Sequence, residues 1–505
     1  MDLFLGVGCA LVVVAVLSTR LAQRFGMPAL VLFVVIGMLA GSSGPGGINF
    51  DNYALAYEVG LLALAVILFS GGLDTRYRLF RAALVPAGLL STVGVALTML
   101  VVGFFAWALT PLGWLEGLLL GAILAPTDAA AVFSVLKGRG LPARLRGILE
   151  TESGTNDPVG IYLTVAFTTL LTTGQTDVWA FLLGIVTQLA LGGLLGFGFG
   201  HALAWLVNRV QLDIYGLYPV LALSGGLLGY AATNLLGGNG FLAVYVIGLV
   251  LANRPLSHRR SITEFMDGAA WGAQVSMFLL LGLLVFPDQL PSVLPVALLV
   301  TLVLTLVARP LAVWLTLLPL YRLTHHYRFT VQEQALLMWA GLKGAVPIIL
   351  ATLPLLSQVE NGERLFNIVF VVVIVGTTLQ GLSVVPLARA LGLTHPEPPA
   401  PPVTLELGGD APPGSAVHDV FLEPDHRLVG RTLADTPLPR GVVVAAIYRD
   451  GALVAPRGAT MFNAGDHVYF LSSGENARLT ALLARREASQ ERSQNARSGA
   501  QEDTG

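Results

Sequence analysis

Charged residues are scarce in this chain. Of its 505 residues, 12% are charged and 54% are apolar, and the mean hydropathy is +0.73. A soluble domain carries about a quarter charged residues, so this composition indicates a polytopic membrane protein whose surroundings are the lipid bilayer. The formal net charge of −2 argues against a nucleic-acid partner, which requires a basic surface. The single cysteine, Cys9, excludes an internal disulfide.

Long apolar runs divide the first 392 residues into membrane-spanning segments. A spanning helix needs roughly 17–25 apolar residues. On that basis we predict 13 helices, near residues 3–19, 27–43, 54–72, 83–109, 113–136, 146–171, 179–207, 216–235, 240–252, 268–286, 292–318, 331–356 and 364–389. The first is interpreted as a spanning helix and not as a signal peptide, because it has no basic region before it and no cleavage site after it.

The loop charges predict the orientation of these helices. Fifteen Lys and Arg residues lie in odd-numbered loops, whereas the even-numbered loops hold one, Arg364. Basic loops stay on the cytoplasmic side of a membrane. The N-terminus is therefore predicted outside and the C-terminus in the cytoplasm.

Two of the predicted spans are interrupted. The fifth contains the sequence APTD at residues 125–128, and the twelfth contains GLKGAVP at residues 341–347. These spans lie seven apart, an odd offset, so they cross in opposite directions. Paired interruptions in two inverted repeats point to a transporter site near the membrane midplane. The predicted fold class is all-α, with about 13 transmembrane helices, inverted repeats and two broken helices.

The sixth span carries the sequence ESGTNDP at residues 152–158. Carboxylates at membrane depth mark ion pathways by default. Ser153 and Asp157 share one helix face, and Pro158 cannot donate a hydrogen bond to the carbonyl of Gly154. Hydroxyl, carboxylate and carbonyl oxygens suit a hard cation. Since Asp157 can bind a proton instead, the cluster predicts exchange by competition; the other interpretation is a capping or helix-packing aspartate.

Neighbouring polar residues complete the candidate cation site. Asn156 adds an uncharged amide, which is expected to orient Asp157 or to bridge to the break in the fifth span. At that break Thr127 and Asp128 supply a hydroxyl and a carboxylate. Asp128 is equally suited to cap the half-helix that follows it, and the two roles are compatible.

Two charged residues are expected to form a structural ion pair. Lys343, one of two lysines in the chain, lies within the twelfth span. A buried ammonium needs a counter-ion, and we predict that Glu152 provides it; a role of Lys343 in proton coupling is the alternative. Arg309, in the eleventh span, is expected to snorkel to the interface or to pair internally. Asp74, at the end of the third span, is interpreted as an interfacial acid.

The composition changes after the last span. Residues 393–414 are proline-rich and predict a stiff, extended linker. Residues 415–485 predict a small cytoplasmic α/β domain, and residues 486–505 predict disorder. The elements expected in the domain are strands at 417–422, 442–447 and 468–471 and a helix at 475–485.

The first 392 residues resemble the monovalent cation:proton antiporter family, in its bacterial NhaP-like branch. The matching sequences are FSGGLD at 69–74, GAILAPTD at 121–128, ESGTND at 152–157 and GLKGAV at 341–346. The resemblance implies a homodimeric secondary antiporter of the bacterial inner membrane that exchanges a monovalent cation for H⁺ in cation and pH homeostasis. No enzymatic activity and no cofactor are expected.

The same resemblance assigns roles to individual residues. It implies that Asp157 exchanges proton and cation, and that Ser153, Thr127, Asp128 and Asn156 contribute to the cation site. In the family the Asn–Asp pair marks electroneutral exchange. The family usually has arginine where this chain has Lys343, paired with the acid at Glu152, so the lysine keeps the charge but loses the planar fork.

Residues 415–485 resemble the C-terminal lobe of regulators of potassium conductance. The matching sequences are LVGRTL at 428–433, VAAIYR at 444–449 and AGDHV at 464–468. The resemblance implies a lobe that dimerises and can bind a small regulatory ligand. No Gly-x-Gly-x-x-Gly precedes it, so the accompanying nucleotide-binding lobe is not expected. Because such a lobe is commonly attached to proteins that transport potassium, the resemblance favours K⁺ over Na⁺ as the transported cation.

The competing interpretation is a K⁺ channel or uniporter gated by the C-terminal domain. Such a channel uses a carbonyl filter of the Thr-Val-Gly-Tyr-Gly kind, repeated around an axis. The sequence contains no such filter. A carboxylate that binds a proton or a cation favours a carrier.

Overall fold

The computed structural model describes residues 2–25, 27–136, 139–174, 177–256, 258–323, 328–396 and 415–473. The chain divides into two units, Met1–His395 and Pro396–Gly505, which we call the helical unit and the sheet unit. Most of the predicted linker, the predicted helix at 475–485 and the predicted disordered tail lie outside the described residues.

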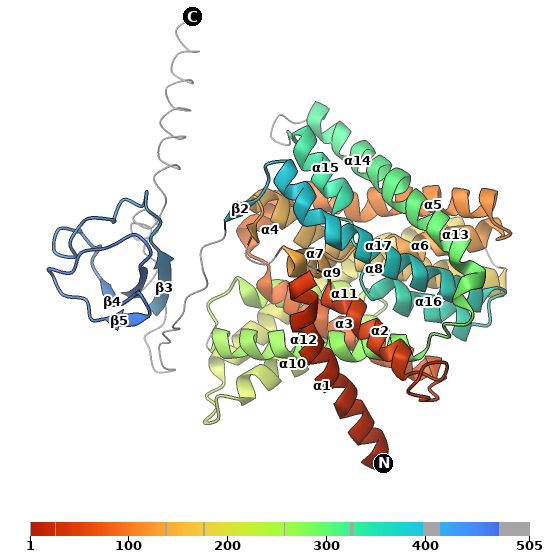
Figure 1. Ribbon diagram of the computed structural model, residues 1–505, viewed down its shortest axis with the longest axis horizontal. Coiled ribbons are helices and arrows are strands. Elements are labelled where there is room, and N and C mark those ends of the chain that lie inside the picture. Colours follow the sequence, from red (N-terminus) through yellow and green to blue (C-terminus); the bar gives the residue numbers. More distant parts are fainter. Residues whose placement is uncertain are drawn as a thin grey trace, which may run out of the picture. The chain divides into compact units, whose positions relative to one another are not determined.

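The described part of the helical unit is built from helices (Figure 1). They are α1 (Asp2–Phe25), α2 (Ala29–Ala40), α3 (Tyr53–Asp74), α4 (Tyr77–Leu89), η1 (Leu90–Gly94), α5 (Val95–Leu109), α6 (Trp114–Leu124), α7 (Ala129–Val135), α8 (Ala143–Thr173), α9 (Val178–Arg209), α10 (Leu217–Leu235), α11 (Gly240–Ala252), α12 (Arg259–Leu283), α13 (Leu290–Val303), η2 (Leu304–Ala308), α14 (Arg309–Leu323), α15 (Val331–Trp339), α16 (Val346–Leu356) and α17 (Gly362–Ala390). Two short strands, β1 (Arg139–Gly140) and β2 (His395–Pro396), complete the list.

Each predicted span coincides with one helix or with a run of consecutive helices. Among the described residues, five helices or helix runs are long and apolar enough to cross a membrane by themselves, or six if the bent pair α6–α7 counts as one. Helices α2, α11 and α16 are apolar but shorter. The helical class is therefore confirmed, while the count of 13 spans and the inverted repeats stay predictions.

Both predicted interruptions are present. The chain bends by 47° between α6 and α7, and α15 ends at Trp339, seven residues before α16 begins. Helix α8, in contrast, runs without a break through Pro158. The spans that precede the two interruptions each contain a five-residue π-helical segment, η1 and η2. These are local features that the apolar pattern did not reveal.

Glycines bring several helices into backbone contact. On α9, Gly192, Gly196 and Gly200 lie four residues apart and face α11; a Cβ on Gly192 would lie 2.7 Å from the carbonyl oxygen of Asn239. On the other side of α11, Gly248 packs against Gly72 of α3. Small residues at such spacing allow close helix packing within a membrane, so α3, α9 and α11 form a tightly packed group.

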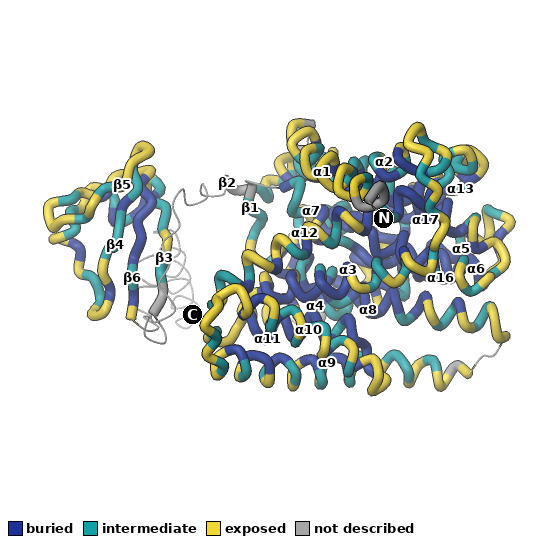
Figure 2. Tube along the Cα trace, turned by 90° about the horizontal axis from the view of Figure 1, so that it is seen from below, coloured by how far each residue is buried: buried dark blue, intermediate teal, exposed yellow. Residues whose placement is uncertain are grey.

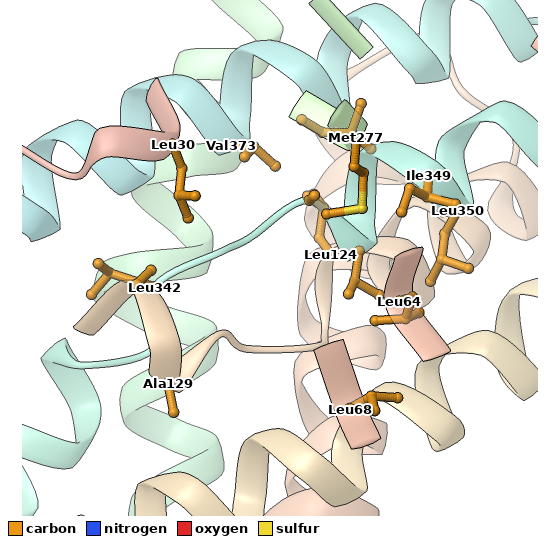
Figure 3. Packing of buried hydrophobic residues seen from close by; sticks show 14 of the residues in the cluster. Leu30, Leu64, Leu68, Leu124, Ala129, Met277, Leu342, Ile349, Leu350 and Val373 are labelled. Carbon is orange, nitrogen blue, oxygen red and sulfur yellow. The ribbon is translucent and has the colours of Figure 1, made fainter. Parts of the chain in front are cut away.

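The apolar core surrounds the two breaks. Figure 3 shows buried side chains from α2, α3, α6, α12, α16 and α17 gathered in this region, including Leu30, Leu64, Leu124, Met277 and Leu350. Exposed positions recur along α9 instead (Figure 2). The breaks are thus enclosed by protein, which is the condition for irregular backbone at membrane depth.

Residues 415–473 of the sheet unit form a sheet of four antiparallel strands in the order β3-β6-β4-β5. They are β3 (Ser415–Phe421), β4 (Val442–Arg449), β5 (Ala452–Val454) and β6 (His467–Ser473). Three of them cover the predicted apolar runs; β5, of three residues, was too short to be predicted. A core of apolar side chains that includes Leu422, Leu428 and Phe462 packs beside the sheet.

Candidate functional site

Helix α8 carries the predicted acidic cluster into the core. Glu152, Asn156 and Asp157 are all at most 5% exposed. Ser153 lies one turn before Asp157, and both side chains line the same cavity. Because the helix continues through Pro158, the fixed spacing of an α-helix sets the distance between hydroxyl and carboxylate.

The two breaks lie against each other. The backbone N–H of Asp128, in the first break, donates to the carbonyl oxygen of Leu342, in the second, over 2.8 Å. The carboxylate of Asp128 accepts from the N–H of Ala131 at 3.2 Å and so caps α7. The same carboxylate packs against Gly344, where an added Cβ would collide with it. Asp128 therefore has the predicted capping role and also lies where the two breaks touch.

Lys343 donates to the first break. Its Nζ lies 3.0 Å from the carbonyl oxygen of Ala125 and 2.9 Å from that of Pro126. These carbonyls follow the end of α6, where no helical N–H is available to them. The ammonium thus lies at the negative end of the α6 dipole. Its own carbonyl accepts from Thr377 on α17 at 2.6 Å.

Glu152 pairs with Arg309 and not with Lys343. Both guanidinium nitrogens of Arg309 donate to the Glu152 carboxylate, one of them over 3.0 Å. Arg309 begins α14 directly after η2, and it also donates to the carbonyl oxygen of Leu337 at the end of α15. The prediction that Glu152 pairs with Lys343 is therefore wrong: the described partner of Glu152 is Arg309. A planar fork matches a carboxylate in two bonds, which an ammonium cannot do.

The sequence did not reveal that Arg309 is the partner of Glu152. The prediction allowed it an internal partner but assigned Glu152 to the lysine. The available signal was the number of cations: Arg309 and Lys343 both lie in predicted spans, and only one of them was given a counter-ion. Each now lies at the carbonyl end of one broken helix, Lys343 beside α6 and Arg309 beside α15.

Asn156 and Ser153 connect α8 to the first break. The amide nitrogen of Asn156 donates to the Thr127 hydroxyl over 2.7 Å, and the N–H of Ala129 donates to the Ser153 hydroxyl over 3.2 Å. The Asn156 Oδ1 atom is buried and has no hydrogen-bond partner among the described residues. Asn156 thus bridges to the break, one of the two roles predicted for it.

A cavity of about 830 Å³, the site cavity, reaches these residues. Thr127, Asp128, Ser153 and Asp157 are among its lining residues. Its other lining residues include Asp74 at the end of α3, together with Arg76, Arg146 and Glu150. The arrangement brings four of the five predicted cation-site residues to one cavity. The fifth, Asn156, donates a hydrogen bond to Thr127. Hydroxyl and carboxylate oxygens that line one cavity can bind either a proton or a desolvated cation.

Comparison with known proteins identifies the family of the chain. The family described as "Sodium/hydrogen exchanger, transmembrane" matches residues 11–390, and the "TrkA-C domain" matches residues 417–484. The chain is 42% identical over 484 residues to the protein named K(+)/H(+) antiporter NhaP2 of Shewanella sp. (strain ANA-3), covering 95% of this chain and 82% of that one. It is 39% identical over 466 residues to the K(+)/H(+) antiporter NhaP of Alkalimonas amylolytica, covering 91% and 79%.

A solved structure shares the fold. The sodium proton antiporter MjNhaP1 of Methanocaldococcus jannaschii, at pH 8, superimposes with a TM-score of 0.64 at 24% identity, covering 78% of this chain and 98% of that one. At this identity the likeness supports the fold alone. One family matches most of the chain, and two relatives are about 40% identical to it over nearly its whole length. This chain therefore belongs to the sodium/hydrogen exchanger family and carries a C-terminal TrkA-C domain.

Proposed function

We propose that this protein is an electroneutral antiporter that exchanges K⁺ for H⁺, with Na⁺ as the other candidate cation. The observation that carries the proposal is the position of Asp157, a buried carboxylate that lines the site cavity together with Ser153 and Asp128. The relatives named as K(+)/H(+) antiporters favour K⁺. A carboxylate that binds one proton or one cation, never both, couples the two flows.

The surrounding residues support one exchanging group. Glu152 is already paired with Arg309, and Asp128 caps α7, so both have structural partners. Asn156 carries no charge. Asp157 is the carboxylate that exchanges its ligand, with Ser153, Thr127 and Asp128 contributing oxygens to the cation and Asn156 holding Thr127 in place. One proton for one monovalent cation moves no net charge.

We further propose a homodimer of 13-span subunits in the bacterial inner membrane, with the N-terminus outside and the C-terminus in the cytoplasm. The inverted repeats find support in the two interruptions and in η1 and η2, which recur seven predicted spans apart. The exposed apolar side chains of α9, such as Trp179, Leu183 and Leu194, suit lipid or a second copy. The sheet unit is proposed to bind a small regulatory ligand.

The assignment is tested with Asp157→Asn in sealed vesicles. An imposed gradient of K⁺, Na⁺, Li⁺ or Rb⁺ drives proton movement, read by a pH-sensitive dye, in the unmodified protein, and the variant loses it because an amide does not titrate. Asp213→Asn is the matched control, because Asp213 is an exposed carboxylate that does not line the site cavity. Exchange retained by purified Asp157→Asn protein would contradict the assignment. Cation flux without proton movement in the unmodified protein would indicate a uniporter.

Stoichiometry is tested separately. A potential of 100 mV acts on one net charge with about 2.3 kcal/mol, so an electrogenic exchanger responds clearly to a potential clamped with valinomycin. For this measurement Na⁺ or Li⁺ is the driving cation, since valinomycin carries K⁺. The exchange rate is expected to stay unchanged. A rate that follows the potential would require a second exchanging charge.

A further inference from the structure

A second cavity, of about 770 Å³, lies between α8, α9 and the start of α11. Among the described residues it shares no lining residue with the site cavity. On α8 its lining residues recur at each turn from Ile161 to Thr173, so they form one stripe along that helix. Most of the lining is apolar, as at Val165, Leu170 and Phe241. Such a cavity is typical of a binding site for an apolar or amphipathic molecule.

Aromatic side chains form the wall of this cavity where α8 meets α9. The hydroxyl of Tyr162 donates to the carbonyl oxygen of Phe181 over 2.8 Å, and the rings of Phe167 and Phe181 lie 6.1 Å apart. On α9, Gly184 packs against Tyr162, where an added Cβ would collide with the hydroxyl. These contacts hold the two helices together beside the cavity and give it a firm wall.

The cavity extends from the membrane surface into the membrane interior. Helix α9 is long and apolar enough to cross a membrane, and Trp179, exposed in its first turn, is a residue type enriched at the lipid–water interface. Asp177, which caps α9, and Gln188 both line the cavity. They lie eleven positions apart, which is about 16 Å along a helix. One leaflet of the hydrocarbon core is about 15 Å thick, so the cavity matches the length of one acyl chain.

The charge at the surface end selects the head group. Among the described lining residues Asp177 is the only charged one, and Thr173 adds a hydroxyl. One oxygen of Asp177, Oδ1, accepts from the N–H groups of Trp179 and Ala180, and a carboxylate has a second oxygen that can accept from a ligand. A carboxylate attracts an ammonium group and repels a head group with a net negative charge.

Amides close the deep end of the cavity. The amide nitrogen of Asn239 donates to the carbonyl oxygen of Pro158 over 3.2 Å, and the amide oxygen of Asn234 accepts from the N–H of Gly240 at 2.9 Å. Since these polar groups are bonded to backbone, they do not require a polar ligand. An apolar chain that enters from the surface therefore ends before it reaches them.

The cavity is open on its lipid side. Val165 and Ala180 line it and are exposed, and Leu182 and Leu183 are exposed next to it on α9. At membrane depth these side chains face lipid or a second copy of the chain. The convex face of a helix from a second copy fills a narrow cavity poorly, whereas a flexible acyl chain follows it.

We propose that the second cavity binds one molecule of phosphatidylethanolamine. Its ammonium group lies at Asp177, and one acyl chain lies along the stripe of α8 against the wall formed by Tyr162 and Phe181. The other chain stays in the bilayer. This site is distinct from the site cavity and carries no part of the proposed exchange.

The test uses the purified full chain and phosphatidylethanolamine with a photoreactive diazirine in one acyl chain. After illumination, peptide mass spectrometry locates the label, which is expected on residues 161–170 and 181–188. Unlabelled phosphatidylethanolamine and phosphatidylglycerol with identical chains then compete for the site. Phosphatidylethanolamine is expected to compete about threefold better, the effect of one exposed charge pair.

Two variants separate the head group from the chain. Asp177→Asn keeps the cap of α9 but removes the charge, so the two lipids should compete equally; Asp213→Asn, at an exposed carboxylate outside the cavity, should keep the threefold difference. Ala180→Phe fills the cavity with a ring and should lower the label on these peptides about tenfold, because the ring takes the space of several methylene groups. Ala190→Phe, at an exposed position of α9 that does not line the cavity, should leave the label unchanged.

Several outcomes would overturn the proposal. They are an unchanged label in Ala180→Phe, equal competition by the two lipids in the unmodified protein, or a threefold difference that persists in Asp177→Asn. A lower dimer fraction of Ala180→Phe in light scattering, with the label retained, would mean that a second copy covers the cavity. If Ala180→Phe does not fold, the competition in the unmodified protein and in Asp177→Asn decides. None of these measurements depends on cation exchange, so a failure of the proposed function leaves this result intact.

Discussion

The helical unit and the sheet unit can be compared through two buried carboxylates, Glu152 and Asp466, each of which accepts two hydrogen bonds from an arginine. In the helical unit Arg309 pairs with Glu152, with side chains 7% and 1% exposed, and joins residues 157 positions apart. In the sheet unit Arg449 pairs with Asp466, with side chains 25% and 0% exposed, across 17 positions. The chemistry is the same, but the surroundings and the span of chain differ.

The difference shows what each pair holds together. Arg309–Glu152 fixes α8 to the start of α14 and, through the carbonyl of Leu337, to the end of α15, so it joins α8 to two helices that come much later in the chain. Arg449–Asp466 closes a local region, in which Asp466 also accepts from the N–H of Asn463 and Arg449 donates to the carbonyl of Met461. Water reaches Arg449 and can replace a lost partner; it cannot do so at Arg309.

The largest effect is expected from breaking the buried pair. Glu152→Gln and Arg309→Met should each lower the free energy of unfolding by about 3–5 kcal/mol, because each strands a buried charge, and the double variant should recover much of the loss. Thermal unfolding of purified protein measures this. Glu150→Gln is the control, since Glu150 pairs with Arg146 at the surface of the same helix and should cost under about 1 kcal/mol. Additive losses in the double variant would mean that the pair contributes no coupling.

A smaller effect is expected in the sheet unit. Asp466→Asn removes the charge that accepts from Arg449 and Asn463, and should destabilise that unit by about 2–3 kcal/mol, the value of hydrogen bonds to a charged group. Limited proteolysis of the full chain reports the loss. Asp450→Asn, at an exposed turn position with φ of 49°, is the control, since asparagine tolerates that conformation. Equal protease sensitivity of the two variants would contradict the structural role of the pair.

Variants of Lys343 distinguish the Glu152–Arg309 pair seen in the structure from the Glu152–Lys343 pair predicted from the sequence. Lys343→Met leaves the carbonyls of Ala125 and Pro126 without their donor, which should cost about 1–3 kcal/mol. Because Glu152 is bonded to Arg309, adding Glu152→Gln should give an additive loss. Recovery of stability in the Lys343→Met, Glu152→Gln protein would restore the predicted Glu152–Lys343 pair. Lys343→Arg should be tolerated with some repacking.

The smallest effect concerns pH in the sheet unit. Burial raises the pKa of the Asp419 carboxyl above its ordinary value of 3.8, and the adjacent His467 opposes that rise. The folded state therefore binds this proton more tightly, so the contribution of Asp419 favours folding below pH 3.8 and is lost as pH rises through the raised pKa. Asp419→Asn should flatten this part of the stability–pH curve, followed by proteolysis of the full chain at a series of pH values that starts below 3.8. A curve that keeps its shape in Asp419→Asn would contradict this contribution.

Much of the fold of the helical unit could be predicted from the sequence, because a lipid bilayer restricts which structures can cross it. Apolar length located the helix runs that the structure describes in the helical unit, and glycine and proline located both breaks. A chain in hydrocarbon must satisfy its backbone within the helix or interrupt it inside protein. The segments η1 and η2 escaped prediction, because a single π-helical turn leaves the apolar pattern almost unchanged. Strand β5 escaped because three residues give too short a pattern.

For the site, the sequence determined which residue types are costly in a membrane and therefore have partners or a function. This was enough to select Asp157, Ser153 and the 125–128 break. The tertiary structure decided the partners. Arg309 and Lys343 carry the same charge and are both buried, and nothing in their spacing says which one faces Glu152. That choice follows from how α8, α14 and the two breaks pack, because a hydrogen bond depends on ångström distances between segments that the sequence leaves far apart.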